Sequence, residues 1–199
     1  MKRNLGMTAA LVLAGAAAFG LSHHAFAQAG AGWVQLFNGQ NIANWDQVGD
    51  ANWTVENGIV SANKGNGFLV SKLPYSDFEL RAEIWTDEPA NSGIFIRCED
   101  AKRIGGQGCY EVNVFDTRPG PEYGTGAIVN IAKVAPPYPK AAGQWNYLEI
   151  SAKGDEMTIT FNGRRTVDRA KDNKHLRGYF GLQYGSGVVK FRSVQIRPI

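Results

Sequence analysis

Hydrophobic and polar residues alternate along two neighbouring segments, residues 91–98 and 110–114, and a period of two residues separates the faces of a β-strand. The apolar face of these predicted strands carries Ile94, Ile96, Cys98, Tyr110, Val112 and Val114. The opposite, solvent-exposed face is predicted to gather a cation, a carboxylate and an amide from Arg97, Glu111 and Asn113. Such a set can bind a sugar, although the solvent face of an ordinary β-sandwich carries similar residues.

Short alternating segments recur along the rest of the chain, and helical periodicity is nearly absent. Asn57-Gly58 and Asn162-Gly163 each separate two such segments, and Asn-Gly favours the type I′ turn of a β-hairpin. We count about ten to thirteen strands, which is too many for one flat sheet. The chain is therefore predicted to be all-β, with two antiparallel sheets packed face to face as a sandwich.

Residues 117–143 interrupt this alternation with several prolines and glycines. Because proline cannot donate to a β-ladder, we expect mainly ordered loop here, with a short strand at 127–131. Long loops in a compact domain are usually functional. Since no linker, charged block or internal repeat divides residues 28–199, we expect them to form a single domain.

Residues 1–27 have the features of a secretory signal peptide. Lys2 and Arg3 precede an apolar segment at 7–21, and Ala25-Phe26-Ala27 matches a cleavage signal. The apolar segment is about fifteen residues long, shorter than the roughly twenty that span a membrane. We expect cleavage after Ala27, export to the periplasm or the medium, and no stable membrane anchor on the mature chain; a retained amino-terminal anchor is the alternative.

Charge and histidine content argue against two classes of function. The sequence has 21 basic and 18 acidic residues, so removal of Lys2 and Arg3 with the leader leaves 19 basic residues and a net charge of +1. This balance does not favour a nucleic-acid partner, which needs a concentrated basic surface. Of the three histidines, His175 alone lies outside the leader, which excludes a histidine-rich zinc site.

The two cysteines, Cys98 and Cys109, lie at the facing ends of the two segments described first. In an exported protein, such a pair suggests a disulfide. Across so short a loop it would stabilise the fold by about 2–3 kcal/mol. A pair of unbridged thiols is the alternative.

Nine sequence blocks, spread from residue 33 to the end of the chain, point to a known family. They include W-V-Q-L-F-N-G-Q-N-I-A-N-W at 33–45, N-S-G-I-F-I-R at 91–97 and Y-E-V-N-V-F-D at 110–116; the others lie at 53–60, 75–80, 125–128, 143–146, 178–183 and 191–196. In these blocks the chain resembles the 3-keto-disaccharide hydrolase domain family, also described as 3-keto-glucoside lyases and hydratases. The resemblance implies a concanavalin A-like jelly roll with a ligand groove on the concave face of one sheet.

The resemblance also implies a glycoside substrate whose sugar carries a ketone at C3. A carboxylate can remove the acidified C2 proton, the glycosidic oxygen at C1 then leaves, and water adds to the unsaturated ketone. Glu111 is the candidate base, and Arg97 is the candidate stabiliser of the enediolate oxygen. Asn91 and Asn113 are candidates for holding sugar hydroxyls, because amides both donate and accept hydrogen bonds.

Asp116 is the third catalytic candidate, although strict alternation places it on the opposite face from Glu111. The spacing Glu111-x-Asn113-x-x-Asp116 is similar to the E-x-D-x-x-E of glucanases of this general fold. Two carboxylates at a suitable separation would allow retaining hydrolysis. The asparagine at the middle position counts against that ordinary glycosidase chemistry.

Further candidates are weaker. Glu79, Lys133 and Gln183 are expected to contact substrate, although a solvated strand or loop explains them equally well. A divalent metal could be bound by Glu111, Asp116 and His175, but the spacing does not require one.

Two positions depart from the family pattern, with Asn113 where Gln is usual and Val129 where Tyr is usual. The shorter amide and the missing aromatic ring affect substrate choice more than chemistry. The leading prediction is an exported enzyme that cleaves 3-keto-glycosides by elimination and hydration, with net hydrolysis of an oligosaccharide or other glycoside. A non-catalytic carbohydrate-binding module on the same fold is the alternative, and a conventional glycosidase acting on unoxidised glucan is a third hypothesis.

Overall fold

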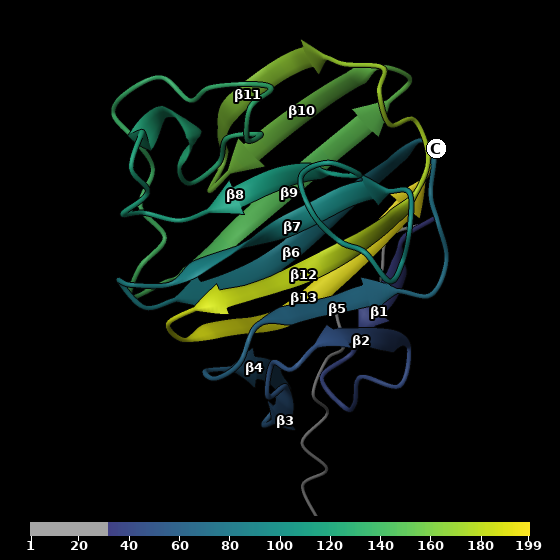
Figure 1. Ribbon diagram of the computed structural model, residues 1–199, viewed down its shortest axis with the longest axis vertical. Coiled ribbons are helices and arrows are strands. Elements are labelled where there is room, and N and C mark those ends of the chain that lie inside the picture. Colours follow the sequence, from purple (N-terminus) through teal and green to yellow (C-terminus); the bar gives the residue numbers. More distant parts are fainter. Residues whose placement is uncertain (1–31) are drawn as a thin grey trace, which may run out of the picture.

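The computed structural model describes residues 32–199, so the predicted signal peptide lies outside the described part. These residues form thirteen strands in two antiparallel sheets, which confirms the all-β sandwich (Figure 1). The eight-stranded sheet has the order β11 (Arg164–Lys171), β10 (Glu156–Phe161), β9 (Trp145–Lys153), β6 (Phe78–Thr86), β13 (Val189–Pro198), β4 (Ile59–Ala62) and β3 (Thr54–Glu56), with β1 (Val34–Phe37) paired to β13. The five-stranded sheet has the order β2 (Trp45–Gly49), β5 (Gly67–Ser71), β12 (Tyr179–Ser186), β7 (Asn91–Cys98) and β8 (Tyr110–Val114).

Both predicted Asn-Gly hairpins are present, between β3 and β4 and between β10 and β11. The φ angles are 50° and 79° at Asn57 and Gly58, and 49° and 78° at Asn162 and Gly163. Positive φ at both central residues is what a type I′ turn requires. The twist of this turn matches that of the flanking strands, which explains why these dipeptides mark the hairpins in the sequence.

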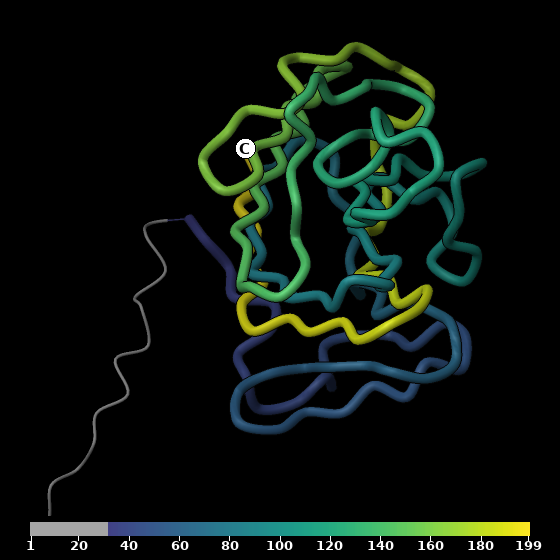
Figure 2. The backbone as a smooth tube through the Cα atoms, turned by 90° about the vertical axis from the view of Figure 1, so that its left-hand side faces the viewer, coloured from purple at the N-terminus to yellow at the C-terminus, as the bar shows by residue number. Residues whose placement is uncertain are grey.

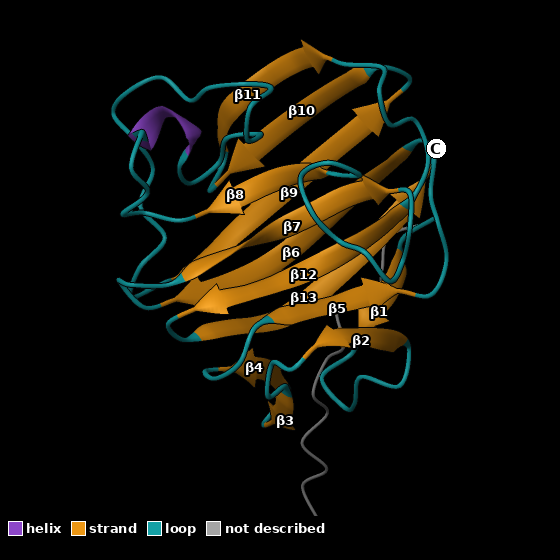
Figure 3. Ribbon diagram, in the orientation of Figure 1, coloured by secondary structure: helices purple, strands orange, loops and turns teal. Residues whose placement is uncertain are grey.

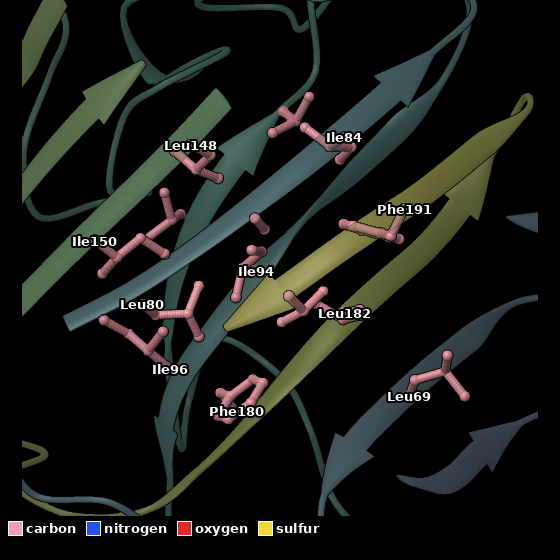
Figure 4. Close-up of a cluster of buried hydrophobic side chains, with 14 of the residues drawn as sticks. Leu69, Leu80, Ile84, Ile94, Ile96, Leu148, Ile150, Phe180, Leu182 and Phe191 are labelled. Atoms are coloured by element: carbon pink, nitrogen blue, oxygen red, sulfur yellow. The ribbon is translucent and has the colours of Figure 1, made fainter. Parts of the chain in front are cut away.

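The hydrophobic core lies between the two sheets, which Figure 2 shows as two layers. Strand β6 alternates strictly between buried and partly exposed residues, as its sequence predicts. Figure 4 shows side chains from both layers meeting in this space, among them Leu80 and Ile84 from β6 and Ile94 and Leu182 from the facing sheet. Full burial of one such side chain stabilises by about 1.5–3 kcal/mol.

Strand β7 differs from this pattern, because every residue from Ser92 to Cys98 is buried. One face of β7 packs in the core, and a second apolar cluster covers part of the other face. In that cluster Phe95, Cys98 and Cys109 pack against Phe68, Ile104 and Tyr179. The Cys98–Cys109 disulfide is formed, as predicted, and closes the loop that carries Ile104.

Residues 117–143 form the predicted long loop, which contains the short 3₁₀ helix η1 (Pro121–Tyr123) beside β8 (Figure 3). The expected strand at 127–131 is reduced to two isolated antiparallel bridges, Ile128 to Ala132 within the loop and Val112 to Ile128 across to β8. Hydrogen bonds on both sides of the Val112 to Ile128 bridge nevertheless attach the loop to β8, from the Asn113 N–H to the Ala127 carbonyl at 3.0 Å and from the Val129 N–H to the Glu111 carbonyl at 3.0 Å. Within residues 32–199, no helix has the length and apolarity needed to cross a membrane.

Candidate functional site

The candidate site lies on the face of the five-stranded sheet that points away from the sandwich core, called the outward face below. Ile94 and Val112 point into the core, so their neighbours on β7 and β8 point outward. The register places Glu111 opposite Phe95, and Asn113 opposite Gly93. The register of β12 with β7 adds Gln183 opposite Gly93. Three of the predicted site residues are therefore neighbours on one face.

Gly93 makes room for this group. A Cβ atom at this position would lie 2.7 Å from the Val112 carbonyl oxygen and 3.4 Å from Gln183 Oε1. Glycine in a strand interior often marks such a close approach. The Gln183 amide therefore lies over Gly93, between β12 and Asn113.

Two amide oxygens at this place are buried without a partner. Asn113 donates through Nδ2 to the Tyr123 carbonyl at 2.8 Å, whereas its Oδ1 accepts no hydrogen bond from residues 32–199. Gln183 Oε1 likewise accepts no hydrogen bond from residues 32–199. A buried acceptor without a donor costs about 1–3 kcal/mol. Both oxygens therefore have acceptor capacity that the described residues do not use, and Gln183, which is only partly buried, lies nearer to solvent than Asn113.

The prediction that Asn113 lies on a solvent-exposed face is wrong, because its side chain is fully buried. The physical reason is the loop at 117–143, which covers the end of β8 and accepts a hydrogen bond from the Asn113 amide through the Tyr123 carbonyl. The outward direction of the side chain was predicted correctly from the alternation. The burial of Asn113 comes from the loop at 117–143, which has no alternating pattern.

Glu111 is partly buried on the outward face, and its carboxylate forms no ion pair or hydrogen bond with the described residues. Burial raises the pKa of Glu111 above its ordinary value, and the positive charge of Arg118 partly opposes this shift in pKa. A carboxylate with a raised pKa binds a proton more strongly than an ordinary one, which suits a general base. Val129 lies next to Glu111, since its N–H donates to the Glu111 carbonyl at 3.0 Å.

Arg118 is the functional candidate that the sequence did not reveal. It lies in the long loop, and no alternation or motif marks it. Its guanidinium forms no ion pair within 4.0 Å with any of residues 32–199, although it is close enough to Glu111 to influence its pKa. Arg118 is therefore a cation available to a ligand beside the Glu111 carboxylate.

Arg97 does not join the site, which corrects its predicted exposure. Its side chain is fully buried, and the guanidinium donates to the carbonyls of Ser76 and Gly154 at 2.9 Å and 2.7 Å and to Asp77 at 3.2 Å. The φ angle of 53° at Arg97 interrupts the regular alternation of β7, and the register of β7 with β12 shifts between Phe95 and Cys98. With its donors occupied by backbone and by Asp77, Arg97 joins loops to the sheet.

Asp116 also lies outside the outward face, two residues after the end of β8. Its carboxylate accepts hydrogen bonds from the Thr125 hydroxyl at 2.6 Å, from the Ala141 N–H at 2.8 Å and from the Ala142 N–H at 3.0 Å. These contacts hold the two ends of the long loop together. The predicted pairing of Asp116 with Glu111 as two catalytic carboxylates therefore does not match this arrangement.

Glu79 belongs to the other sheet. It projects from β6 on the outer side of the eight-stranded sheet, where it pairs with Arg197. The sandwich core separates this position from Glu111, so the predicted role of Glu79 in the same sugar site is wrong.

Asn91 and Lys133 lie at the margin of the site. Asn91 begins β7, and its Nδ2 would be 3.2 Å from a Cβ atom at Gly185, which places its amide over that glycine. Lys133 pairs with Glu122 at 3.6 Å and lies 5.4 Å from the centre of the Tyr123 ring. Because the Tyr123 carbonyl receives the Asn113 amide, Lys133 is on the part of the loop that covers the site. Substrate contact by either residue stays a prediction.

The three residues suggested as metal ligands are not brought together. His175 is buried, with Nδ1 at 2.9 Å from Glu99 Oε1, and the Asp116 carboxylate is held by the loop backbone. Residues 32–199 contain no group of three or more His, Cys, Asp or Glu side chains placed to hold a metal ion.

A family model described as the 3-keto-alpha-glucoside-1,2-lyase-like domain matches residues 32–197. The chain belongs to this family. The match confirms the resemblance identified from the nine sequence blocks. A search of curated proteins finds no match to the chain.

Several solved structures with similar folds are described as carbohydrate-active or carbohydrate-binding proteins. One, described as a candidate glycosyl hydrolase from Parabacteroides distasonis, is 24% identical with a TM-score of 0.70, over 84% of this chain and 99% of its own. The carbohydrate-binding module CBM66 from Bacillus subtilis is 20% identical with a TM-score of 0.60, over 79% and 97%. Porphyranase B from Zobellia galactanivorans is 12% identical with a TM-score of 0.58, over 83% and 92%. At these identities the likeness establishes the fold, which both enzymes and binding modules for carbohydrates share.

Proposed function

We propose that this member of the 3-keto-alpha-glucoside-1,2-lyase-like family is an exported enzyme that cleaves 3-keto-glycosides, with Glu111 as the base. The observation that carries the proposal is a single carboxylate, partly buried and unpaired within the described residues, beside two amide oxygens that lack donors. Export is supported by the disulfide, which is typical of proteins in oxidising compartments.

In the proposed reaction, Glu111 takes the C2 proton of the sugar, and the electrons of that C–H bond form an enediolate with the C3 ketone. The electrons then form a C1–C2 double bond as the bond from C1 to the glycosidic oxygen breaks. The protonated Glu111, or water, returns a proton to the leaving oxygen. Water later adds across the new double bond, so that the net change is hydrolysis.

The described residues suit this route in three respects. The raised pKa of Glu111 strengthens it as a base and makes its protonated form a competent acid afterwards. Arg118 supplies a positive charge near Glu111, which would stabilise the developing negative charge on the enediolate oxygen. Asn113 Oδ1 and Gln183 Oε1 would accept hydrogen bonds from sugar hydroxyls, which satisfies both buried acceptors.

A conventional two-carboxylate glycosidase fits less well. Retaining and inverting hydrolysis both need a second carboxyl group on the other side of the scissile bond. Asp116, the candidate for that role, is engaged by three donors of its own loop. Elimination needs one base, so it suits the groups that are free on the outward face.

A non-catalytic carbohydrate-binding module remains the second candidate function. The observation that favours it is Val129, which stands beside Glu111 at a position where the family usually has Tyr. Without that hydroxyl, the outward face would still bind a sugar through its amides while lacking a group for chemistry.

The test is incubation of the protein with a 3-keto-glucoside and with its unoxidised parent, with and without chelator, while sugar release is followed. We expect release from the keto substrate alone, and a loss of at least about a hundredfold in kcat for Glu111→Gln. Glu56→Gln, an exposed glutamate on β3 of the other sheet, is the matched control and should keep wild-type activity. Equal release by Glu111→Gln would refute the site, and no release from either glucoside would favour the binding module.

A further inference from the structure

A cavity of about 450 Å³ lies at the end of the sandwich where β6 ends, β7 begins and β8 ends. Trp85, Asp87 and Glu88 line it from the end of β6 and the turn that follows, and Thr117 and Lys140 line it from the two ends of the long loop. The size is in the range of small-molecule sites, roughly 300–1,000 Å³. Asp116, engaged by its own loop, also lines the cavity, but Glu111, Arg118, Asn113 and Gln183 do not, so the cavity is separate from the candidate site.

The walls of the cavity are built by hydrogen bonds rather than by loose loops. The Asp116 carboxylate holds the N–H groups of Ala141 and Ala142, and the Gly143 N–H donates to the Thr86 carbonyl at 2.8 Å. On the other side, Asp87 Oδ1 accepts from the Val188 N–H at 2.9 Å. The long loop is thereby joined to the end of β6, and the cavity between them is preformed.

We propose that this cavity is a second carbohydrate-binding site, which takes one neutral sugar unit. The Lys190 ammonium lies 4.4 Å from the centre of the Trp85 ring, and the part of the ring that lines the cavity offers an apolar surface for the C–H face of a sugar. The carboxylates of Asp87 and Glu88 would accept hydrogen bonds from the hydroxyls of the sugar. The Lys140 ammonium donates to the Asp116 carbonyl at 2.8 Å, so it is held on the wall. Since the carboxylates of Asp87, Glu88 and Asp116 outnumber the ammonium groups of Lys140 and Lys190, a uronic acid or another anionic sugar is disfavoured.

The cavity and Glu111 belong to different sides of the sandwich. The alternation of β6 places Trp85 on the outer side of the eight-stranded sheet, on the same face as Glu79, whereas Glu111 lies on the outward face of the five-stranded sheet. The binding of a sugar in the cavity therefore does not depend on catalysis at Glu111.

The test is isothermal titration calorimetry of the full chain with three unoxidised neutral pentasaccharides, cellopentaose, laminaripentaose and maltopentaose, and with pentagalacturonic acid as the anionic probe. We expect at least one neutral pentasaccharide to bind, and the anionic probe to bind at least about tenfold more weakly. Trp85→Ala should weaken the neutral ligand by about tenfold or more. Trp33→Ala is the control, because Trp33 packs against Arg81 elsewhere on the outer side of the same sheet and does not line the cavity. It should change affinity by less than about twofold.

Absence of binding by all three neutral pentasaccharides would overturn the proposal, as would wild-type affinity of Trp85→Ala or equal weakening by Trp33→Ala. If Trp85→Ala fails to fold, the exposed-turn variant Glu88→Ala decides, with an expected loss of about threefold. Binding that depends on Trp85, together with no cleavage of a 3-keto-glucoside, would support the cavity and refute the proposed function. Cleavage of a 3-keto-glucoside, together with pentasaccharide binding that does not depend on Trp85, would support the proposed function and refute the cavity as a sugar site.

Discussion

Replacement of Asp116 by alanine separates a structural role from a catalytic one. The change removes the acceptor of three hydrogen bonds, from the Thr125 hydroxyl at 2.6 Å, the Ala141 N–H at 2.8 Å and the Ala142 N–H at 3.0 Å. A hydrogen bond to a charged group contributes about 1.5–3 kcal/mol. Three independent bonds would give roughly 4.5–9 kcal/mol, but water can reach this partly exposed position and the bonds share one carboxylate. We therefore expect a loss of about 3 kcal/mol in the free energy of unfolding.

A loss of this size is measurable by urea denaturation or by calorimetry. For a domain of this length, about 3 kcal/mol corresponds to a fall of roughly 6–12 °C in Tm. Hydrogen exchange should accelerate at the amides of Ala141 and Ala142, because the carboxylate protects both. Asp116→Asn should lose less, about 1–2 kcal/mol, because its carbonyl oxygen still accepts.

The control for Asp116→Ala is Asp168→Ala, which removes an exposed acid of β11 paired with Arg165 at 3.2 Å. Exposed pairs of this kind are worth about 0–1 kcal/mol. If Asp116→Ala is no less stable than Asp168→Ala and yet inactive, the structural role of Asp116 is refuted and a catalytic role is supported. If Asp116→Asn keeps its fold and its activity, the carboxylate is not required for chemistry.

Three further predictions follow from the described contacts. Glu111 must be ionised to act as a base, so kcat/KM should rise as the pH passes through the raised pKa of Glu111. Arg118→Gln removes the positive charge that lowers this pKa, so the rise in kcat/KM should move to higher pH in a pH–rate profile. Arg97→Ala leaves buried carbonyls and an acid without their donor, and urea unfolding should show a loss of about 3–5 kcal/mol; a loss below about 1 kcal/mol would contradict the structural role. Replacement of both Cys98 and Cys109 by serine should lower the free energy of unfolding by about 2–3 kcal/mol, and the same Tm with and without a reducing agent in the wild type would speak against the bridge.

The sequence predicts the fold well because most of its strands are half-buried. In a strand such as β6, one face lies in the core and the other in water, so the alternation of apolar and polar residues shows which side chains point inward. The Asn-Gly hairpins and the disulfide are local features with a direct chemical cause, and both were found as expected. The same alternation placed Glu111 and Asn113 on one face, and the register sets them opposite Phe95 and Gly93. The position of Gln183 opposite Gly93 comes from the register of β12 with β7, which the sequence did not predict.

The parts that the alternation did not predict are those decided by loops. Arg97 has the alternation of an exposed residue, but a positive φ angle and the carbonyls of distant loops place it in the interior. Asn113 is covered by a segment that carries no periodic signal, and Arg118 lies within that segment. Contacts between a loop and a strand depend on the path of the whole chain, so one strand's pattern contains no information about them.

The distribution of carboxylates is what favours elimination over ordinary hydrolysis on this fold. Displacement at C1 needs two carboxyl groups, and the spacing of Glu111 and Asp116 suggests such a pair in the sequence. In the folded chain the two groups have different environments. One is partly buried, without a partner among the described residues and with a raised pKa, and the other is surrounded by donors from its own loop. A ketone at C3 makes the second carboxylate unnecessary, because it acidifies the C2 proton and allows one base to act first on carbon and then, in its protonated form, on the leaving oxygen.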